Sequence, residues 1–124
     1  CPSMLDTVAP QMIKIDHPAP FMTFTFEVAE EWKTRVPEVV HEDGTSRAQV
    51  LKREYNPRYY DMMKALENLT GNGVSLNTSL NRRGEPMICS PTDALNMFFG
   101  SDLEYLIMED ILVVKDGVEG SGLD

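Results

Sequence analysis

The chain has 124 residues, of which 42% are hydrophobic and 25% are charged, as in an ordinary globular domain. Its formal net charge of −9 argues against general binding of nucleic acid. No apolar run is long enough to span a membrane, and the first residues do not have the pattern of a signal peptide. We therefore expect a cytoplasmic domain without nucleic-acid or membrane partners, and free thiols at Cys1 and Cys89.

The charge is spread unevenly along the chain. Residues 47–83 contain seven Lys or Arg and three acids, so this segment is basic within an acidic protein. A basic segment of this kind could bind a small anion, or it could be the solvated face of a helix next to a basic turn. Charge alone leaves both interpretations open.

In the first half of the chain, residues that interrupt regular secondary structure alternate with short segments that are expected to be extended. Residues 1–19 contain several prolines and are expected to be irregular. Pro20–Val28 alternates apolar and polar residues and predicts a strand. One helical turn is expected over Ala29–Arg35, a turn at Asp43-Gly44 and an extended segment over Ala48–Leu51.

Capping residues predict two helices in the second half. Asn56 is an N-cap, the proline after it suits the first helical position, and Gly71 ends this helix. Ser90 is followed by a proline and opens a second helix, which ends at Gly100.

The rest of the chain completes the expected architecture. Residues 74–80 alternate as a strand, and residues 103–114 predict a hydrophobic strand or a pair of strands. Residues 117–124 are typical of a flexible tail. Strands that alternate with helices indicate an α/β or α+β fold, with a mixed twisted sheet and flanking helices in a domain over residues 1–116.

Two features are candidates for a binding site. The first is the segment Gly44-Thr45-Ser46-Arg47, because a guanidinium fork suits carboxylate or phosphate oxygens. The second is a polar stripe along the expected strand, formed by short neutral side chains at alternating positions: Ser75, Asn77, Ser79 and Asn81. Such groups could bind a small polar ligand, or they could satisfy the backbone of a loop. Motifs for zinc, for a phosphate-binding loop and for a nucleophile elbow are absent from the sequence.

Four stretches, in chain order, carry a resemblance to a known family. They are H-E-D-G-T-S-R-A-Q-V, N-P-R-Y-Y, T-G-N-G-V-S-L-N-T-S-L-N-R-R-G-E-P and S-P-T-D-A. Together they resemble the C-terminal, YrdC-like region of the NodU/CmcH family of O-carbamoyltransferases. The similarity extends from Met4 to Lys115 and covers nearly the whole chain.

The resemblance implies a specific chemistry. In that family the YrdC-like domain binds ATP, with Mg²⁺, and carbamoyl phosphate, and forms carbamoyl adenylate. A large N-terminal Kae1-like domain, which holds iron or another metal through histidines, transfers the carbamoyl group to a hydroxyl acceptor. The chain would then contain most, but not all, of a domain with the YrdC-like fold. Its partners would be ATP, carbamoyl phosphate and the N-terminal domain of the same protein.

The family motifs also imply roles for particular residues. Arg47 matches the arginine of the D-G-T-x-R motif and would neutralise phosphate, while Asn77 and Ser79 would contact the adenylate phosphate or the carbamoyl group. Arg47 and Ser79 are the implied catalytic residues. The remaining members of the implied binding set lie in the same two motifs: His41, Gly44, Thr45 and Asn81. No metal ligand is expected in this chain.

Some positions of the motifs are expected to be structural. Thr78 should face the core if the alternation of the strand holds, and Glu85 and Pro86 should form the turn after the strand. The family's basic segment upstream of the P-S-M-L stretch is absent from the sequence, so the chain is expected to be a catalytically incomplete fragment.

Two rival interpretations remain open. The first is a non-catalytic module that binds a nucleotide or phosphate, or that interacts with a partner. The second is an enzyme similar to threonylcarbamoyl-adenylate synthase, against which the acidic net charge argues. A homodimer through an exposed sheet edge also stays open.

Overall fold

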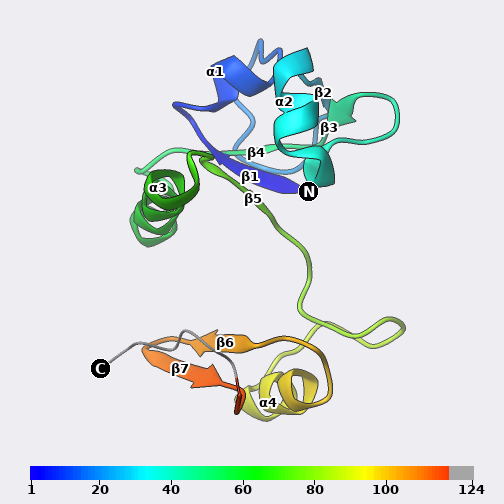
Figure 1. Ribbon diagram of the computed structural model, residues 1–124, viewed down its shortest axis with the longest axis vertical. Helices are drawn as coiled ribbons and strands as arrows, with labels where there is room; N and C mark the ends of the chain where they lie inside the picture. Colours follow the sequence, from blue (N-terminus) through cyan, green and yellow to red (C-terminus); the bar gives the residue numbers. More distant parts are fainter. Residues whose placement is uncertain (118–124) are drawn as a thin grey trace. The chain divides into compact units, whose positions relative to one another are not determined.

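The computed structural model of the protein describes residues 1–117 (Figure 1). The chain divides into two compact units, Cys1–Thr78 and a second unit that begins at Ser79. In the described part of the chain, no helix has the length and apolar character needed to cross a membrane. The tail expected over residues 117–124 lies, from residue 118 on, outside the described residues. The domain expected over residues 1–116 stays a prediction.

The first unit is built on a three-stranded mixed sheet. Its strands are β1 (Pro2–Leu5), β4 (Gln49–Leu51) and β5 (Val74–Leu76), in the order β4-β1-β5. β1 is parallel to β4 and antiparallel to β5, and all four of its residues are buried. The expected mixed sheet with flanking helices is therefore confirmed.

The expectation that residues 1–19 are irregular was wrong, because they contain the central strand β1 and the short helix α1 (Ala9–Met12). Two prolines misled the prediction. Pro2 is the first residue of β1, a position that a strand tolerates. Pro10 lies in the first turn of α1, where a backbone N–H would have no helical partner.

Helices cover both sides of this sheet. Figure 1 shows α3 (Pro57–Thr70) on one side, and α1 and α2 (Glu30–Arg35) on the other. A 3₁₀ turn, η1 (Pro37–Val39), follows α2. The buried core combines side chains of the sheet with apolar residues of these helices, among them Met12, Trp32 and Met63.

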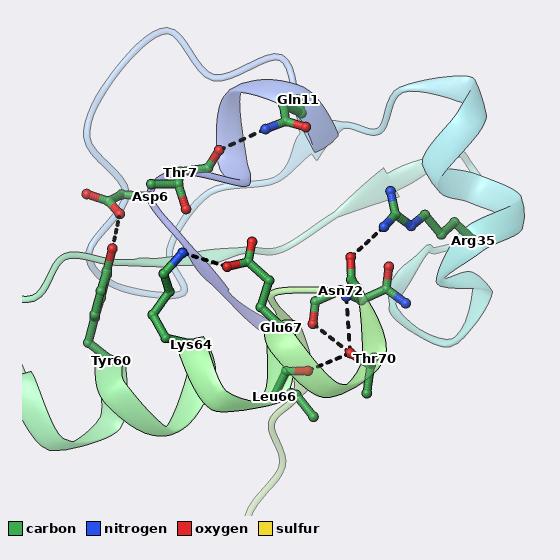
Figure 2. A network of polar contacts seen from close by, with 11 residues as sticks. Asp6, Thr7, Gln11, Arg35, Tyr60, Lys64, Leu66, Glu67, Thr70 and Asn72 are labelled. Atoms are coloured by element: carbon green, nitrogen blue, oxygen red, sulfur yellow. Dashed lines mark hydrogen bonds and ion pairs between the residues drawn. The ribbon is translucent and has the colours of Figure 1, made fainter.

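The caps of α3 are those that the sequence predicts. The Asn56 side chain accepts a hydrogen bond from the Tyr59 N–H, and Gly71 adopts the left-handed conformation with φ of 76°. Polar contacts then tie α3 to its surroundings (Figure 2). The Tyr60 hydroxyl donates to Asp6, just after β1, and Arg35 donates to the Gly71 carbonyl.

The strand expected over Pro20–Val28 was largely wrong. Only β2 (Phe26–Glu27) forms there, and it pairs with β3 (Thr45–Ser46). The preceding segment passes along the edge strand β4 and makes one backbone bond to it, from the Val50 N–H to the Ala19 carbonyl. Pro18 and Pro20 lack the N–H groups that a continuous ladder needs. Two aromatic side chains in or next to this segment are consequently exposed, Phe21 at 69% and Phe24 at 50%.

The strand expected over residues 74–80 ends early. β5 stops at Leu76, and the Asn77 N–H donates to the Cys1 carbonyl in the last bond beside β1. Thr78 is exposed, so the expectation that it faces the core was wrong. Beyond Asn77, within the described residues, no neighbouring strand continues the hydrogen-bond ladder. The alternating side chains there therefore do not lie on a sheet with one buried face.

The second unit contains the expected helix and strand pair. α4 (Pro91–Phe99) is capped by the Ser90 side chain, which accepts from the Asp93 N–H, and Gly100 follows its last residue. β6 (Tyr105–Met108) and β7 (Ile111–Val114) form an antiparallel ribbon. A small core centred on Phe98 joins the helix to the ribbon.

Close packing at Gly73 gives a first prediction. A Cβ atom at this position would lie 2.8 Å from Leu5 Cδ1 and 2.9 Å from Val8 Cγ2. Gly73→Ala should therefore lower the free energy of unfolding by about 1–3 kcal/mol through overpacking. Urea denaturation followed by circular dichroism measures the change, with the exposed Leu69→Ala as the control. Equal stability of Gly73→Ala and the wild type would contradict the packing described.

Candidate functional site

The candidate site lies on the face of the mixed sheet that α3 approaches. The register pairs Ser3 of β1 with both Gln49 of β4 and Ser75 of β5. Side chains two residues apart along a strand share a face, so this row of three polar side chains lies on one face of the sheet. The polar stripe predicted on β5 is therefore part of a wider polar surface that all three strands form.

We call Gln49, Ser3 and Ser75 the inner row. Each of these side chains makes a hydrogen bond within the protein. The Ser3 hydroxyl donates to Gln49 Oε1 at 3.0 Å, and Gln49 Nε2 donates to the Pro20 carbonyl at 3.2 Å. The hydroxyls of Ser75 and Tyr59 lie 3.3 Å apart. Ser3 is fully buried. The inner row has its polar groups satisfied and is suited to hold neighbouring groups in place.

A second row, which we call the outer row, consists of Arg47, Cys1 and Asn77, each two residues from a member of the inner row. The Asn77 N–H donates to the Cys1 carbonyl at 2.9 Å, and the Arg47 guanidinium donates through Nε and Nη2 to the Cys1 sulfur. The sheet thus brings Arg47 and Asn77, two of the predicted site residues, to the two sides of Cys1.

The outer row is more open than the inner row. Arg47 is exposed, while Cys1 and Asn77 are half-buried. Within residues 1–117 no carboxylate lies within ion-pair distance of Arg47. Its partner is a thiol, which is a weak hydrogen-bond acceptor. The guanidinium fork is therefore not neutralised by a carboxylate of the described chain and can receive an anion.

The loop of His41, Gly44 and Thr45 precedes Arg47 and is held by its own hydrogen bonds. Asp43 Oδ1 accepts from the backbone N–H and the hydroxyl of Thr45, and the His41 ring lies 3.2 Å from that hydroxyl. Gly44 has φ of 79°, which favours glycine. These contacts shape the turn that leads through β3 to Arg47. Direct contact of the loop with a ligand stays a prediction.

Ser79 and Asn81 belong to the second unit. The Ser79 hydroxyl donates to Asn81 Oδ1 at 2.5 Å, and Asn81 Nδ2 donates to the carbonyls of Arg82 and Glu85. The amide of Asn81 thus satisfies a turn of the backbone, one of the two roles that the sequence left open. Ser79 is exposed. The ligand contacts predicted for both residues remain predictions.

Sequence reasoning missed Ser3, Gln49 and Tyr59. Ser3 lies in the segment that was expected to be irregular, and Gln49 in an extended segment whose neighbours were unknown. Tyr59 lies in the first turn of α3, and its approach to Ser75 depends on how this helix packs on the sheet. The register of Pro2–Leu5 with β4 and β5, which aligns Ser3 with Gln49 and Ser75, requires the structure.

Within residues 1–117, no three His, Cys, Asp or Glu side chains lie close enough together to hold a metal ion. Asp43 of the acidic loop is already engaged by Thr45, and the hydrogen bonds from the hydroxyl and the backbone of Thr45 hold the pKa of this carboxyl below its ordinary value. One oxygen of the Asp43 carboxylate is thus already used as an acceptor within residues 41–45.

Comparison with known proteins places this architecture among C-terminal domains of carbamoyltransferases. Residues 1–115 match the family described as Carbamoyltransferase C-terminus, and the chain belongs to this family. An uncharacterised protein of Synechocystis is 32% identical over 92% of this chain and 22% of its own length.

Nodulation proteins are among the relatives. Nodulation protein NolO of Bradyrhizobium diazoefficiens is 38% identical over 77% of this chain and 18% of its own length. Nodulation protein U of Rhizobium tropici is 35% identical over 67% of this chain and 14% of its own length. The chain spans about a fifth of the length of the curated relatives it matches. The resemblance to the NodU/CmcH family is thus confirmed.

The hydrogen bonds within the loop predict a measurable titration. The Asp43 pKa should lie below its ordinary value of 3.8, and Thr45→Val should raise it because the hydroxyl donor is lost. Carbon-detected NMR titration of the carboxyl measures both values, with the exposed Thr34→Val as the control. Because the folded pKa is depressed, the ionised carboxylate stabilises the fold above the unfolded pKa, and this contribution is lost as the pH falls through the folded pKa. An Asp43 pKa that is the same in Thr45→Val and wild type would contradict the assigned hydrogen bond.

Proposed function

We propose that the chain is the nucleotide- and carbamoyl-phosphate-binding part of an O-carbamoyltransferase. In this proposal it binds ATP and carbamoyl phosphate and forms carbamoyl adenylate. Hydrolysis of carbamoyl phosphate yields carbamate and phosphate, and carbamate displaces pyrophosphate from ATP. A further domain of the same protein then transfers the carbamoyl group to a hydroxyl acceptor.

One observation carries the proposal within the described structure. Arg47 presents an exposed fork of donors at one end of the sheet, with no carboxylate partner within the described residues. Arginine suits phosphate because two parallel N–H donors match two oxygens. Asn77 lies on the other side of Cys1 and offers a neutral amide, which can bind a carbamoyl group without adding charge.

An arginine and an asparagine suit this reaction because negative charge develops as it proceeds. Transfer to and from a phosphate builds negative charge on oxygen atoms, and fixed donors stabilise it without reorganisation. The inner row supplies the rigidity, because Ser3 and Gln49 are hydrogen-bonded and leave the strands little freedom. Arg47 is the residue proposed to neutralise phosphate, and Ser79 is proposed to contact the reacting group.

The cofactors and partners are part of the same proposal. Mg²⁺ would accompany ATP and would be held mainly by the phosphate oxygens of the nucleotide, since Asp43 Oδ1 already accepts two hydrogen bonds from Thr45. The relatives are about five times as long as this chain, and this difference supports a further, transferring domain. A metal such as iron in the transferring domain is also proposed on the resemblance. A homodimer through an exposed sheet edge and a cytoplasmic location are proposed on the sequence.

A non-catalytic module that binds phosphate or a nucleotide is the alternative function. The same guanidinium fork would serve it, so the structure of the site alone does not separate the two. Carbamoyl-dependent exchange of pyrophosphate into ATP separates them, because a binding module would show saturable binding without exchange.

Substitution of Arg47 tests the anion site. Arg47→Ala should weaken binding of carbamoyl phosphate by about 1.5–3 kcal/mol, the range for hydrogen bonds to charged groups. Arg47→Lys should recover part of the affinity, because it keeps the charge and loses the fork. Isothermal titration calorimetry measures the change. Arg53→Ala is the matched control, because Arg53 is also exposed but pairs with Asp61. Equal affinities of Arg47→Ala and wild type would contradict the proposal.

Substitution of Ser79 tests the proposed contact of its hydroxyl with the reacting group. Ser79→Ala should slow carbamoyl-dependent pyrophosphate exchange while the free energy of unfolding stays nearly unchanged, because the side chain is exposed. The exchange is measured in the protein with all of its domains. An unchanged exchange rate would contradict a role for this hydroxyl in the chemistry.

A further inference from the structure

The ribbon of β6 and β7 has apolar side chains on both of its faces. Its two strands read Tyr-Leu-Ile-Met and Ile-Leu-Val-Val, and the Tyr105 hydroxyl is the only side-chain oxygen or nitrogen among them. An antiparallel ribbon with one face toward water usually alternates apolar and polar residues. A continuous apolar run is instead typical of a strand that is covered on both faces. We therefore expect an element on each side of this ribbon.

The second unit itself covers one face of the ribbon. Leu106 is 6% exposed and belongs to the small core around Phe98 of α4, against which Met108 and Val113 also pack. Figure 1 shows α4 beside the ribbon. Because side chains alternate along a strand, the neighbours of Leu106 lie on the opposite face.

Within residues 1–117 that opposite face is largely uncovered, and we call it the outer face. The register pairs Tyr105 with Val114 and Ile107 with Leu112, and these four side chains form the outer face. Ile107 is 71% exposed, Tyr105 44% and Leu112 39%, while Val114 is half-buried. Large apolar side chains that lie side by side and stay this exposed indicate a site of contact with another protein surface.

Acidic residues lie at both ends of the ribbon. Residues 102–116 contain five acids and one basic residue, Lys115. The Lys115 ammonium donates to the Ser101 carbonyl and lies over the Phe98 ring. None of the acids forms an ion pair with another residue of the described chain, so the margin of the outer face is negatively charged. The acids are all exposed: Asp102, Glu104 and Asp116 at the open end of the ribbon, and Glu109 and Asp110 in its turn.

This charge selects among the elements that can cover the outer face. A second copy of the chain would bring the same acids against the first set, and like charges across an interface repel. An element with lysines or arginines at its margin is attracted instead. The ribbon is two strands wide and about 13 Å long, which matches a few turns of one helix better than a second sheet.

The length of the relatives indicates where such a helix lies. The family match, over residues 1–115, includes both strands of the ribbon. The chain spans about a fifth of the length of its curated relatives, so most of each relative lies outside the region that matches this chain. A covering helix is therefore expected in another part of the same protein.

We propose that the outer face of the ribbon is the docking site of an amphipathic helix from another part of a longer protein. This helix has an apolar stripe that packs on Ile107 and Leu112. Lysines or arginines on its flanks lie near Glu104 and near the turn at Glu109-Asp110. The ribbon is then the middle layer between α4 and the docked helix. The inference does not depend on the proposed binding of ATP or carbamoyl phosphate.

The first test uses the full chain and two synthetic amphipathic peptides of about 15 residues, a length at which an isolated helix begins to be stable. Both peptides carry a leucine stripe, and one has lysines on its flanks where the other has glutamates. The lysine peptide should shift the amide NMR signals of residues 105–114 saturably. It should bind about tenfold more tightly than the glutamate peptide, because the margin of the outer face is acidic.

Substitutions on the outer face locate the binding. Ile107→Thr should weaken the lysine peptide about tenfold, because apolar contact is lost while a β-branched side chain keeps the strand. Glu104→Gln should weaken it by about threefold, as for an exposed ion pair. Leu69→Thr is the matched control, because Leu69 is 86% exposed on α3 in the first unit, and it should leave the affinity unchanged. Circular dichroism of each variant checks that the fold is retained.

The second test uses the protein with all of its domains. There the docked helix covers the outer face, so the lysine peptide should not bind to residues 105–114. Hydrogen exchange of these residues should also be slower than in the chain alone. Tight binding of the peptide to this longer protein would place the covering element elsewhere and would overturn the inference.

Other results also overturn it. They are the absence of shifts in residues 105–114 with either peptide, equal affinities of the two peptides, and binding that Leu69→Thr weakens but Ile107→Thr does not. A dimer of the chain in analytical ultracentrifugation that Ile107→Thr dissociates would assign the outer face to a second copy. Carbamoyl phosphate takes no part in these outcomes, so the inference and the proposed function fail separately.

Discussion

The pairing of β1 with two neighbours is the constraint on which the first unit depends. β1 is parallel to β4 and antiparallel to β5, and it is buried on both faces. This register aligns segments from the beginning, the middle and the end of the unit. A shift of one residue would turn Ser3 away from Gln49 and Ser75 and would place Met4 among polar groups. The polar surface therefore exists only in the observed register.

The two rows of this surface have complementary properties. The inner row has its hydrogen bonds satisfied within the protein and includes the fully buried Ser3. The outer row exposes Arg47, whose guanidinium faces a thiol rather than a carboxylate. Buried, satisfied polar groups make the strands rigid, and a rigid support is what an anion-binding group requires.

Local signals in the sequence predicted the helices well, because their caps are local. Asn56, Gly71 and Ser90 act as predicted, and the mixed sheet was expected from the order of the elements. Strands were predicted less well. β1 was hidden by the proline at its first position, and Pro20–Val28 lacked the partner strand that its alternation suggested. Arg47 and the stripe through Asn77 were singled out from the sequence, whereas Ser3 and Gln49 depend on long-range register, which no local pattern specifies.

An NMR titration of the isotopically labelled chain with carbamoyl phosphate tests the central claim most directly. The account predicts that the amide signals of Arg47, Ser3 and Asn77 shift together and follow one dissociation constant, because one end of the sheet holds all of them. Shifts confined to other parts of the chain, or signals of Arg47 and Asn77 that follow different constants, would contradict the account.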